Sequence, residues 1–192
     1  MNIIRGTKGC QEIFFSHPSR VIDKVPLICS NIFSFGFMKD FRVTKKDLGP
    51  ILDHAAGEYP FECCGIITGP DSEEGDISIH RCTNIQNRLH EEDPEEHPRD
   101  ARTAYYINPD ELLKILKTAR ENSRSIRAFY HSHTDHKAYF SEEDKRRALF
   151  FGEPAYPDAK HIVVSVMEGK VEEIKVFSWN EASGEFREEP LA

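Results

Sequence analysis

Two histidines separated by one residue, His131 and His133, end the segment SIRAFYHSH, in which apolar and polar residues alternate. Such alternation is typical of a β-strand, and side chains two residues apart on a strand project from the same face, roughly 6.5 to 7 Å apart along it. Two imidazoles at this spacing can converge on one metal ion. The chain is therefore expected to place the end of a strand beside a candidate metal site.

A helix start follows these histidines after a short loop. The motif Ser141-Glu-Glu-Asp144 is close to a capping box, in which Ser141 caps the helix and Asp144 is its third residue. By itself this motif requires only a helix. Together with His131 and His133, it brings a carboxylate near the carboxyl end of the strand as a third ligand. Two histidines, one carboxylate and an open fourth position, filled by water, describe a catalytic zinc site.

A hydrolytic zinc site also needs a carboxylate that accepts the proton of the water and passes it to the leaving amine. The best candidate is Glu62 in the segment EYPFECCG, because it stands at the start of a buried apolar strand. Burying a carboxylate there is costly, so its presence indicates a function. Glu58, at the end of the preceding helix, can instead face water.

The remaining pattern predicts a mixed α/β fold. A helix is expected from near Asp47, because Pro50 is tolerated only in a first turn; its apolar stripe is Leu48, Ile51, Leu52 and Ala55. A second helix starts with Asn108 as cap and Pro109 in the first position. Strands are expected at residues 41–44, 62–69, 76–82, 104–107 and 125–133, a helix at 141–151, a hairpin at 160–179 that turns at 168–170, and an exposed polar loop at 87–102.

Residues 1–40 show no sustained helical or strand period. The sequence is therefore divided into an N-terminal extension at 1–40, a catalytic domain at 41–180 and a C-terminal tail at 181–192. Met38 lies at the first boundary. This position makes Met38 an alternative native start, with residues 1–37 either a start-site artefact or a dispensable extension.

The composition excludes several functional classes. Lys and Arg number 25 against 33 Asp and Glu, and the net charge of -8 repels phosphate backbones and anionic lipid surfaces. No apolar run reaches the length of about 18 residues expected of a membrane span, and the first residues lack the order of a secretory signal. Five cysteines without a CxxC pair indicate neither a disulfide framework nor a thiolate metal site. A protein of the reducing cytoplasm, without nucleic-acid or membrane partners, is expected.

With these five residues, Glu62, His131, His133, Ser141 and Asp144, the sequence resembles the JAMM/MPN+ metalloprotease family, whose signature is a distant Glu followed by H-x-H-x7-S-x2-D. The segment from HSH to the final Asp matches without a gap, and PFECCG resembles the upstream P-x-E-x-x-G segment, within a resemblance over about residues 41–180. It implies a single domain with a curved mixed sheet flanked by helices, similar to the cytidine deaminase fold. It also implies one zinc ion per chain on His131, His133 and Asp144, with Glu62 as general acid and base and Ser141 stabilising the tetrahedral oxyanion.

The resemblance also implies a reaction and a partner. The family hydrolyses peptide or isopeptide bonds beside the C-terminal Gly-Gly of ubiquitin-like proteins. The compact form is similar to the bacterial branch, whose substrates are ubiquitin-like sulfur-carrier proteins. This chain departs from many relatives at Thr134 and Phe140, where they carry proline. Neither position supplies a ligand, so these departures concern loop rigidity and substrate fit.

Other interpretations are open at this point. A non-catalytic MPN-type scaffold lacks at least one ligand, whereas all are present here. A zinc nucleobase deaminase requires H-x-E together with P-C-x-x-C, and this chain has no CxxC pair. A cysteine hydrolase would use Cys63 or Cys64, but packing alone explains both cysteines. His136 is expected to face solvent. The sequence does not distinguish zinc from iron or another divalent ion, name the carrier protein or the residue after Gly-Gly, or decide the oligomeric state, with which a homodimer is compatible.

Overall fold

The computed structural model describes residues 44–70 and 76–191, which lie within one compact unit, Phe37–Ala192. Its helices are α1 (Lys45–Glu58), α2 (Gln86–Glu92), α3 (Pro109–Glu121) and α4 (Glu142–Ala148). Its strands are β1 (Cys64–Pro70), β2 (Ser78–Cys82), β3 (Arg124–Thr134), β4 (Leu149–Phe150), β5 (Glu153–Pro154), β6 (Lys160–Met167), β7 (Lys170–Asn180) and β8 (Glu185–Glu189). The predicted extension at 1–40 with Met38, and the strand residues 41–43, lie outside the described residues.

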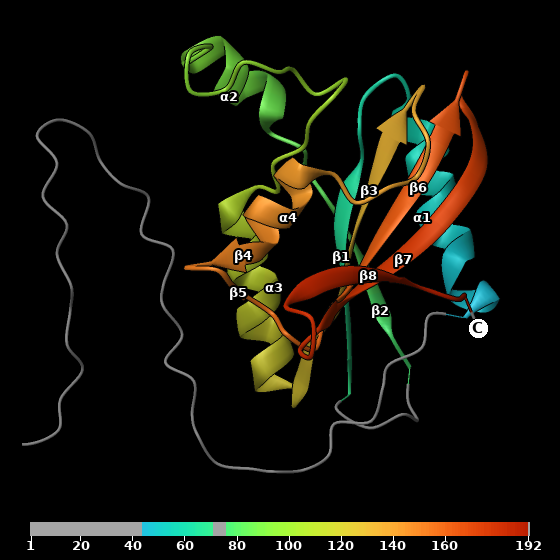
Figure 1. The fold of residues 1–192 in the computed structure, drawn as a ribbon, viewed down its shortest axis with the longest axis vertical. Helices are drawn as coiled ribbons and strands as arrows, with labels where there is room; N and C mark the ends of the chain where they lie inside the picture. The colour runs from blue at the N-terminus through green and yellow to red at the C-terminus, as the bar shows by residue number, and fades with distance from the viewer. Residues whose placement is uncertain (1–43, 71–75, 192) are drawn as a thin grey trace, which may run out of the picture. The chain divides into compact units, whose positions relative to one another are not determined.

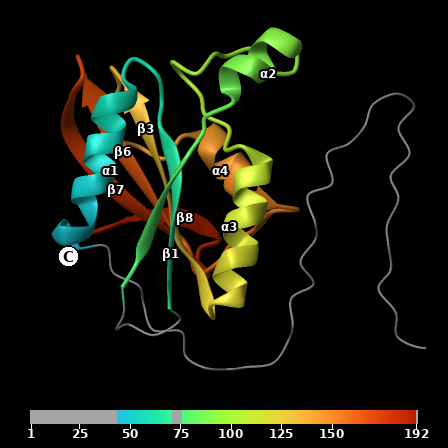
Figure 2. The same ribbon diagram turned by 180° about the vertical axis from the view of Figure 1, so that it is seen from behind.

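Six strands form one sheet in the order β2-β1-β3-β6-β7-β8, which Figures 1 and 2 show from opposite sides. β3 and β6 are parallel, whereas the other neighbouring strands of this sheet are antiparallel. A parallel pair needs a crossover connection, and α4 lies in the segment that joins β3 to β6. The mixed sheet with flanking helices confirms the predicted α/β class.

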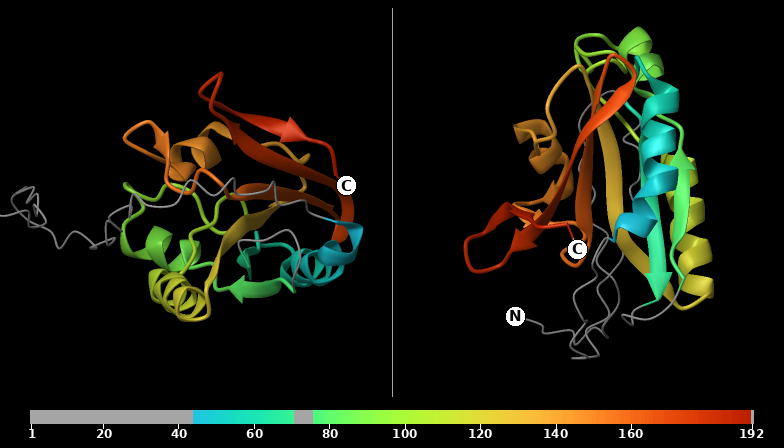
Figure 3. Two further views of the ribbon diagram at one scale, coloured as in Figure 1. Left: turned by 90° about the horizontal axis from the view of Figure 1, so that it is seen from below. Right: turned by 90° about the vertical axis from the view of Figure 1, so that its right-hand side faces the viewer.

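Helices cover both faces of this sheet (Figure 3). α1 packs on one face, and the predicted apolar stripe supplies the contact: Leu48, Ile51 and Ala55 are buried and Leu52 is partly buried. α3 packs on the other face with three partly buried residues, Leu112, Ile115 and Leu116. The hydrophobic core is therefore divided into two layers by the sheet.

Side chains of β3 alternate between these two layers. Tyr130 belongs to the α1 layer, whereas Phe129 packs in the α3 layer. Since His131 and His133 follow Phe129 in steps of two, they project on the same face as α3. The alternation predicted for this strand thus determines the face on which the histidines lie.

β1 and β3 approach each other closely at Gly65, which pairs with Tyr130. A Cβ atom on Gly65 would lie 2.2 Å from the Tyr130 ring. Tyr130 is almost fully buried, and its hydroxyl lies 2.9 Å from Nδ1 of His54 in α1. Glycine at position 65 therefore allows a large aromatic side chain to join the sheet to α1.

The first helix begins at Lys45 rather than near Asp47, where the sequence predicted its start. Thr44 is the N-cap, and its N–H donates to the Asp47 carboxylate over 2.9 Å. This capping box sets the start, so Pro50 lies inside the helix and not in its first turn.

The limits of α3 agree with prediction, whereas those of α4 differ. The Asn108 side chain accepts a hydrogen bond from the Asp110 N–H over 3.0 Å, as expected of an N-cap, and Pro109 is the first helical residue. α4 ends at Ala148, before the predicted limit of residue 151, because the chain turns there into the β4–β5 hairpin.

β6 and β7 form the predicted hairpin, whose turn contains Glu168 and Gly169, both with positive φ. β8 pairs with β7 and lies in the segment predicted as a C-terminal tail. Across residues 44–70 and 76–191, no helix combines the length and the apolar character needed to cross a bilayer.

The strand predicted at 104–107 is not present; one isolated bridge to Asn84 takes its place. The partly buried Asn84 side chain donates to the carbonyls of Glu62 and Ala104 and accepts from the Tyr106 N–H. Backbone groups that would otherwise need a neighbouring strand are thus satisfied by one side chain.

The polar segment 87–102, predicted as an exposed loop, largely belongs to an ordered structure that begins with α2. The Gln86 amide donates to the Arg99 carbonyl, and the Asn87 side chain accepts from the Ala101 N–H. Gln86 and Ala101 are both buried. These contacts fold the segment back on itself, which its polar composition does not indicate.

Candidate metal centre

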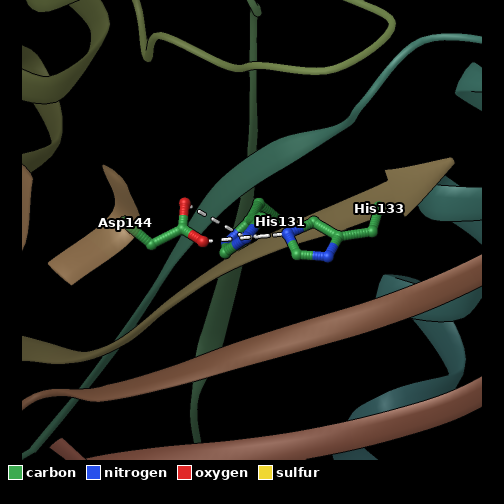
Figure 4. A group of neighbouring side chains, drawn as sticks. All are labelled: His131, His133 and Asp144. Carbon is green, nitrogen blue, oxygen red and sulfur yellow. Dashed lines mark hydrogen bonds and ion pairs between the residues drawn. The ribbon is translucent and has the colours of Figure 1, made fainter. Parts of the chain in front are cut away.

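The three predicted ligands point toward one another, as Figure 4 shows. They lie on the face of the sheet that α3 covers, because His131 and His133 share a face with Phe129. His131 and His133 project from β3, and Asp144 projects from the first turn of α4. The two Nε2 atoms are 3.2 Å apart, and Asp144 oxygens lie 3.5 Å from Nε2 of His131 and 3.7 Å from Nε2 of His133. All three side chains are buried, and their ligand atoms lie within 4.8 Å of one another.

These distances fit a tetrahedral metal ion. With bonds of about 2.0 to 2.1 Å, ligand atoms at the corners of a tetrahedron are about 3.3 to 3.4 Å apart. The 3.2 Å between the two Nε2 atoms is close to this value. Asp144 approaches His131 with Oδ1 and His133 with Oδ2, and with one oxygen taken as its ligand atom the three atoms lie within 4.8 Å of one another. Because three ligands leave one corner open, the group could hold zinc or another divalent ion that accepts nitrogen and oxygen ligands.

Neighbouring groups orient both imidazoles. Nδ1 of His133 lies 3.0 Å from the Lys137 carbonyl, and a proton donated there leaves the Nε2 lone pair for a metal. The His131 ring stacks on Tyr105, with the ring centroids 4.4 Å apart. Burial lowers the pKa of His131, so the neutral form, which binds metals, is favoured.

Asp144 is held by Ser141, the N-cap of α4. The Ser141 hydroxyl accepts from the Asp144 N–H over 3.1 Å and donates to Asp144 Oδ2 over 2.5 Å, so the predicted capping box is present. Burial opposes ionisation of Asp144, but interactions with His131, His133 and Ser141 outweigh it and hold the pKa of the carboxyl below its usual range. The ionised form that a metal requires is therefore the stable one.

Glu62 lines the same cavity as His133, Ser141 and Asp144. It is only 6% exposed, and burial raises the pKa of its carboxyl to about 8, although the charge of His133 acts against this. Glu58, the alternative considered from sequence, has a side chain that is 56% exposed on α1. The fold thus brings Glu62, and not Glu58, to the ligands.

The backbone around Glu62 is held on both sides. Its N–H donates to the Ala101 carbonyl over 2.7 Å, and its carbonyl accepts from the Asn84 amide over 2.9 Å. The next residue, Cys63, donates its N–H to Oγ of Ser132 over 2.8 Å. Ser132 stands between the two histidines, so these bonds connect Glu62 to the metal-binding strand.

Several residues that sequence reasoning did not single out complete the cavity wall: Arg99, Tyr105, Tyr139, Glu143 and Arg147. Arg99 and Tyr105 are distant in sequence from Tyr139, Glu143 and Arg147, so the local pattern could not predict that the two groups share one wall. His136, predicted to face solvent, is exposed and also lines the cavity.

Cys63 and Cys64 are fully buried and belong to opposite layers of the core. Burial raises the pKa of the Cys63 thiol to about 12 and that of Cys64 well above its usual range. Since the thiolate is the nucleophilic form, neither residue is suited to attack a substrate. Both act as small packing residues, as predicted.

Comparisons with known proteins agree with this geometry. The family model described as prokaryotic homologs of the JAB domain matches residues 44–180. The chain is 26% identical over 150 residues to CysO-cysteine peptidase of Mycobacterium tuberculosis, which covers 78% of this chain and 88% of that protein. It is 28% identical over 106 residues to desampylase of Haloferax volcanii, which covers 53% of this chain and 68% of that protein.

Two solved structures share the fold. A protein from Salinibacter ruber has a TM-score of 0.52 and 27% sequence identity, over 79% of this chain and 90% of that chain. Protein DSY2949 from Desulfitobacterium hafniense has a TM-score of 0.56 and 23% identity, over 79% of this chain and 91% of that chain. Both likenesses extend over most of the unit described above.

Proposed function

The chain belongs to the prokaryotic homologs of the JAB domain, and we propose that it is a zinc-dependent peptidase or isopeptidase. Its proposed substrate is a ubiquitin-like or sulfur-carrier protein, hydrolysed at the bond after the C-terminal Gly-Gly. The observation that carries this proposal is the convergence of three buried ligand side chains beside the buried Glu62. The names of two relatives, CysO-cysteine peptidase and desampylase, support a hydrolase of this kind.

In this proposal His131, His133 and Asp144 hold one zinc ion per chain. When bound, such an ion lowers the pKa of a water ligand toward about 7 and polarises the scissile carbonyl. The protein orients His133 through the Lys137 carbonyl and keeps Asp144 ionised, both of which favour metal binding.

Glu62 is the proposed carrier of the proton. As a carboxylate it accepts a proton from the attacking water, whose oxygen forms a bond to the carbonyl carbon of the terminal glycine. The C–N bond to the leaving amine then breaks, and Glu62 returns the proton to that nitrogen. Burial raises its pKa to about 8, and a group that titrates near the working pH suits this exchange.

Ser141 is proposed to stabilise the oxyanion that forms from the scissile carbonyl. Its hydroxyl lines the cavity, and a donor aimed at developing charge contributes about 3 kcal/mol in comparable sites. The hydroxyl donates to Asp144 here, so this role requires it to rotate toward the substrate. The catalytic role would redirect the proton now donated to Asp144 Oδ2, whereas the capping role uses an oxygen lone pair and does not need that proton.

We propose the catalytic domain at residues 41–180, with 1–40 and 181–192 as additional segments; the second of these contributes β8 to the edge of the domain's sheet. All the residues proposed to act in the reaction lie between positions 62 and 144. Among the described residues, Cys63, Cys64 and Cys82 are free thiols, which suits the reducing cytoplasm.

The test is hydrolysis of a sulfur-carrier protein extended beyond its terminal Gly-Gly, followed by intact mass. It compares the zinc-loaded protein with Glu62→Gln at equal metal content, and with Glu58→Gln as the matched control. Glu58 is suitable because its carboxylate is exposed on α1 and belongs to no cavity wall described here. Cleavage by the wild type and Glu58→Gln, but not by Glu62→Gln, is expected.

The second candidate is a non-catalytic scaffold that keeps its metal. Its prediction differs at one point: the wild type would bind one zinc ion and cleave none of several extended carriers. Equal cleavage by Glu62→Gln and the wild type would instead retain the hydrolase and remove Glu62 from the mechanism.

A further inference from the structure

Three charged side chains on the cavity wall have no part in the proposed reaction. Arg99, from the segment after α2, and Arg147, from α4, both form ion pairs with Glu143. The Arg147 pair is 2.6 Å long, and a second guanidinium nitrogen of Arg147 donates to the Tyr105 carbonyl. All of them line the cavity that also contains Glu62.

On this part of the wall two guanidinium groups face one carboxylate, Glu143, while Glu62 and the proposed ligand Asp144 are the other acidic side chains of the cavity. An arginine has five N–H donors, more than the described contacts of either residue use. The side chains of Arg99 and Arg147 are 41% and 30% exposed, so further donors are accessible to a ligand. Accessible guanidinium donors of this kind suit a small anionic group, which they can bind through charge-assisted hydrogen bonds.

We propose that Arg99 and Arg147 bind the α-carboxylate of the amino acid that leaves, which makes them specificity-determining residues. This inference rests on the proposed function, because it concerns the residue beyond the scissile bond. If the substrate ends one residue after that bond, its carboxylate lies two covalent bonds from the released nitrogen. The carboxylate then enters the cavity of the proposed ligands, where guanidinium groups can bind it through paired hydrogen bonds.

The size of the cavity points to the same class of substrate. Its volume is about 90 Å³, well below the roughly 300 to 1,000 Å³ of pockets for drug-sized ligands. Such a space accepts a short leaving group. A longer extension would also place a neutral amide, in place of a carboxylate, opposite the arginines. The chain is therefore expected to release single terminal amino acids in preference to longer extensions.

The test uses two forms of one substrate: a ubiquitin-like sulfur-carrier protein with alanine after Gly-Gly, ending in either a free carboxylate or a carboxamide. Zinc-loaded wild type, Arg99→Gln and Arg147→Gln are assayed on both forms. Arg146→Gln is the matched control, because Arg146 is exposed on the same helix and is not part of the cavity wall. The measured quantity is kcat/KM for the acid divided by kcat/KM for the amide.

Wild type and Arg146→Gln should favour the acid by about 10- to 100-fold, the effect of hydrogen bonds to a charged group. Arg99→Gln and Arg147→Gln should bring this ratio toward one by slowing hydrolysis of the acid while the amide is unaffected. Arg147→Gln also loses the bond to Tyr105. If it loses activity on both forms, the ratio measured for Arg99→Gln decides.

Three results would overturn this inference alone. Equal hydrolysis of acid and amide by the wild type would do so and leave the proposed function intact. An equal loss of kcat/KM on the acid and the amide in Arg99→Gln would show that the arginines only hold α4 against the segment after α2. The third result combines two observations: the wild type shows no preference for the acid, and both arginine variants relieve inhibition by the Gly-Gly carrier product. The arginines would then bind the new carboxyl terminus of the carrier. Hydrolysis of neither form by the wild type overturns the proposed function, and this inference with it.

Discussion

The Cys63 N–H donates to Oγ of Ser132, which ties the residue after Glu62 to the residue between the two histidines. The next residue of β1, Cys64, lies opposite His131 of β3 in the sheet. The separation between the proposed base and the proposed ligands is therefore set inside the core and not by a surface loop.

Ser132→Ala should destabilise the protein and slow catalysis without removing the metal. The substitution leaves the buried Cys63 N–H without its partner, which costs about 1 to 3 kcal/mol. Urea unfolding, zinc content and kcat measure the three effects. Ser125→Ala is the control on the same strand, because the described contacts give the buried Ser125 hydroxyl no hydrogen-bond partner. Equal stability of the two variants would contradict this assignment.

Gly65→Ala should lower the free energy of unfolding by about 1 to 3 kcal/mol, the usual cost of overpacking a core. The added methyl group would overlap the ring of Tyr130, which is buried in the core. Gly57→Ala, in α1, is the control, because a Cβ there meets nothing within 4 Å. It should be neutral or stabilising by up to about 1 kcal/mol. Similar thermal unfolding of both variants would refute the close-packing argument.

Asp144→Asn should abolish the stabilisation of the protein by zinc. A ligand present at 100 times its dissociation constant stabilises the folded state by about 2.7 kcal/mol, so the wild type should unfold at a higher temperature in zinc than in EDTA. Glu142→Gln is the control on the same helix, with a side chain 86% exposed. The proposed ligand set is wrong if both variants keep the full zinc-dependent shift.

Acid should destabilise the fold partly through His161, a residue outside the ligand group. Burial lowers the pKa of His161 to about 3. An unfolded histidine titrates near about 6.5, so the unfolded chain takes up the proton first as the pH falls below that value. Stability is then lost from about pH 6.5 downward, by on the order of 2 kcal/mol between pH 7 and pH 5.

His161→Phe isolates this contribution, because His161 is packed against aromatic rings that include Phe129 and Phe140. The free energy of unfolding is measured for both proteins at pH 7 and pH 5. The variant should lose less stability than the wild type over this interval. Identical losses would show that His161 does not stay neutral in the folded protein.

Sequence periodicity was sufficient for the parts of the fold that use one repeating contact. The stripe from Leu48 to Ala55 predicted the buried face of α1, and alternation in β3 predicted that His131 and His133 share a face. The capping motif placed Asp144 in the first turn of a helix. Each of these patterns lies within one element and can be read without knowing its neighbours.

Contacts between distant segments could not be predicted in this way. Tyr105 stacks on His131 from the segment that was predicted as a strand. In the fold, the Asn84 side chain satisfies backbone groups of this segment in place of a neighbouring strand. Arg99 meets Glu143 only after α2 and the following residues fold back. Local propensity does not predict such contacts, since they depend on how whole elements pack.

The two halves of the site differ in how far apart their residues lie along the chain. The ligands span one short stretch, residues 131–144, whereas Glu62 reaches them through a contact between residues that are 69 positions apart. In the proposed reaction, the base therefore comes beside the ligands only when β1 pairs with β3. The proposed hydrolysis would then depend on the complete sheet, whereas the proposed ligands come from one local stretch of sequence.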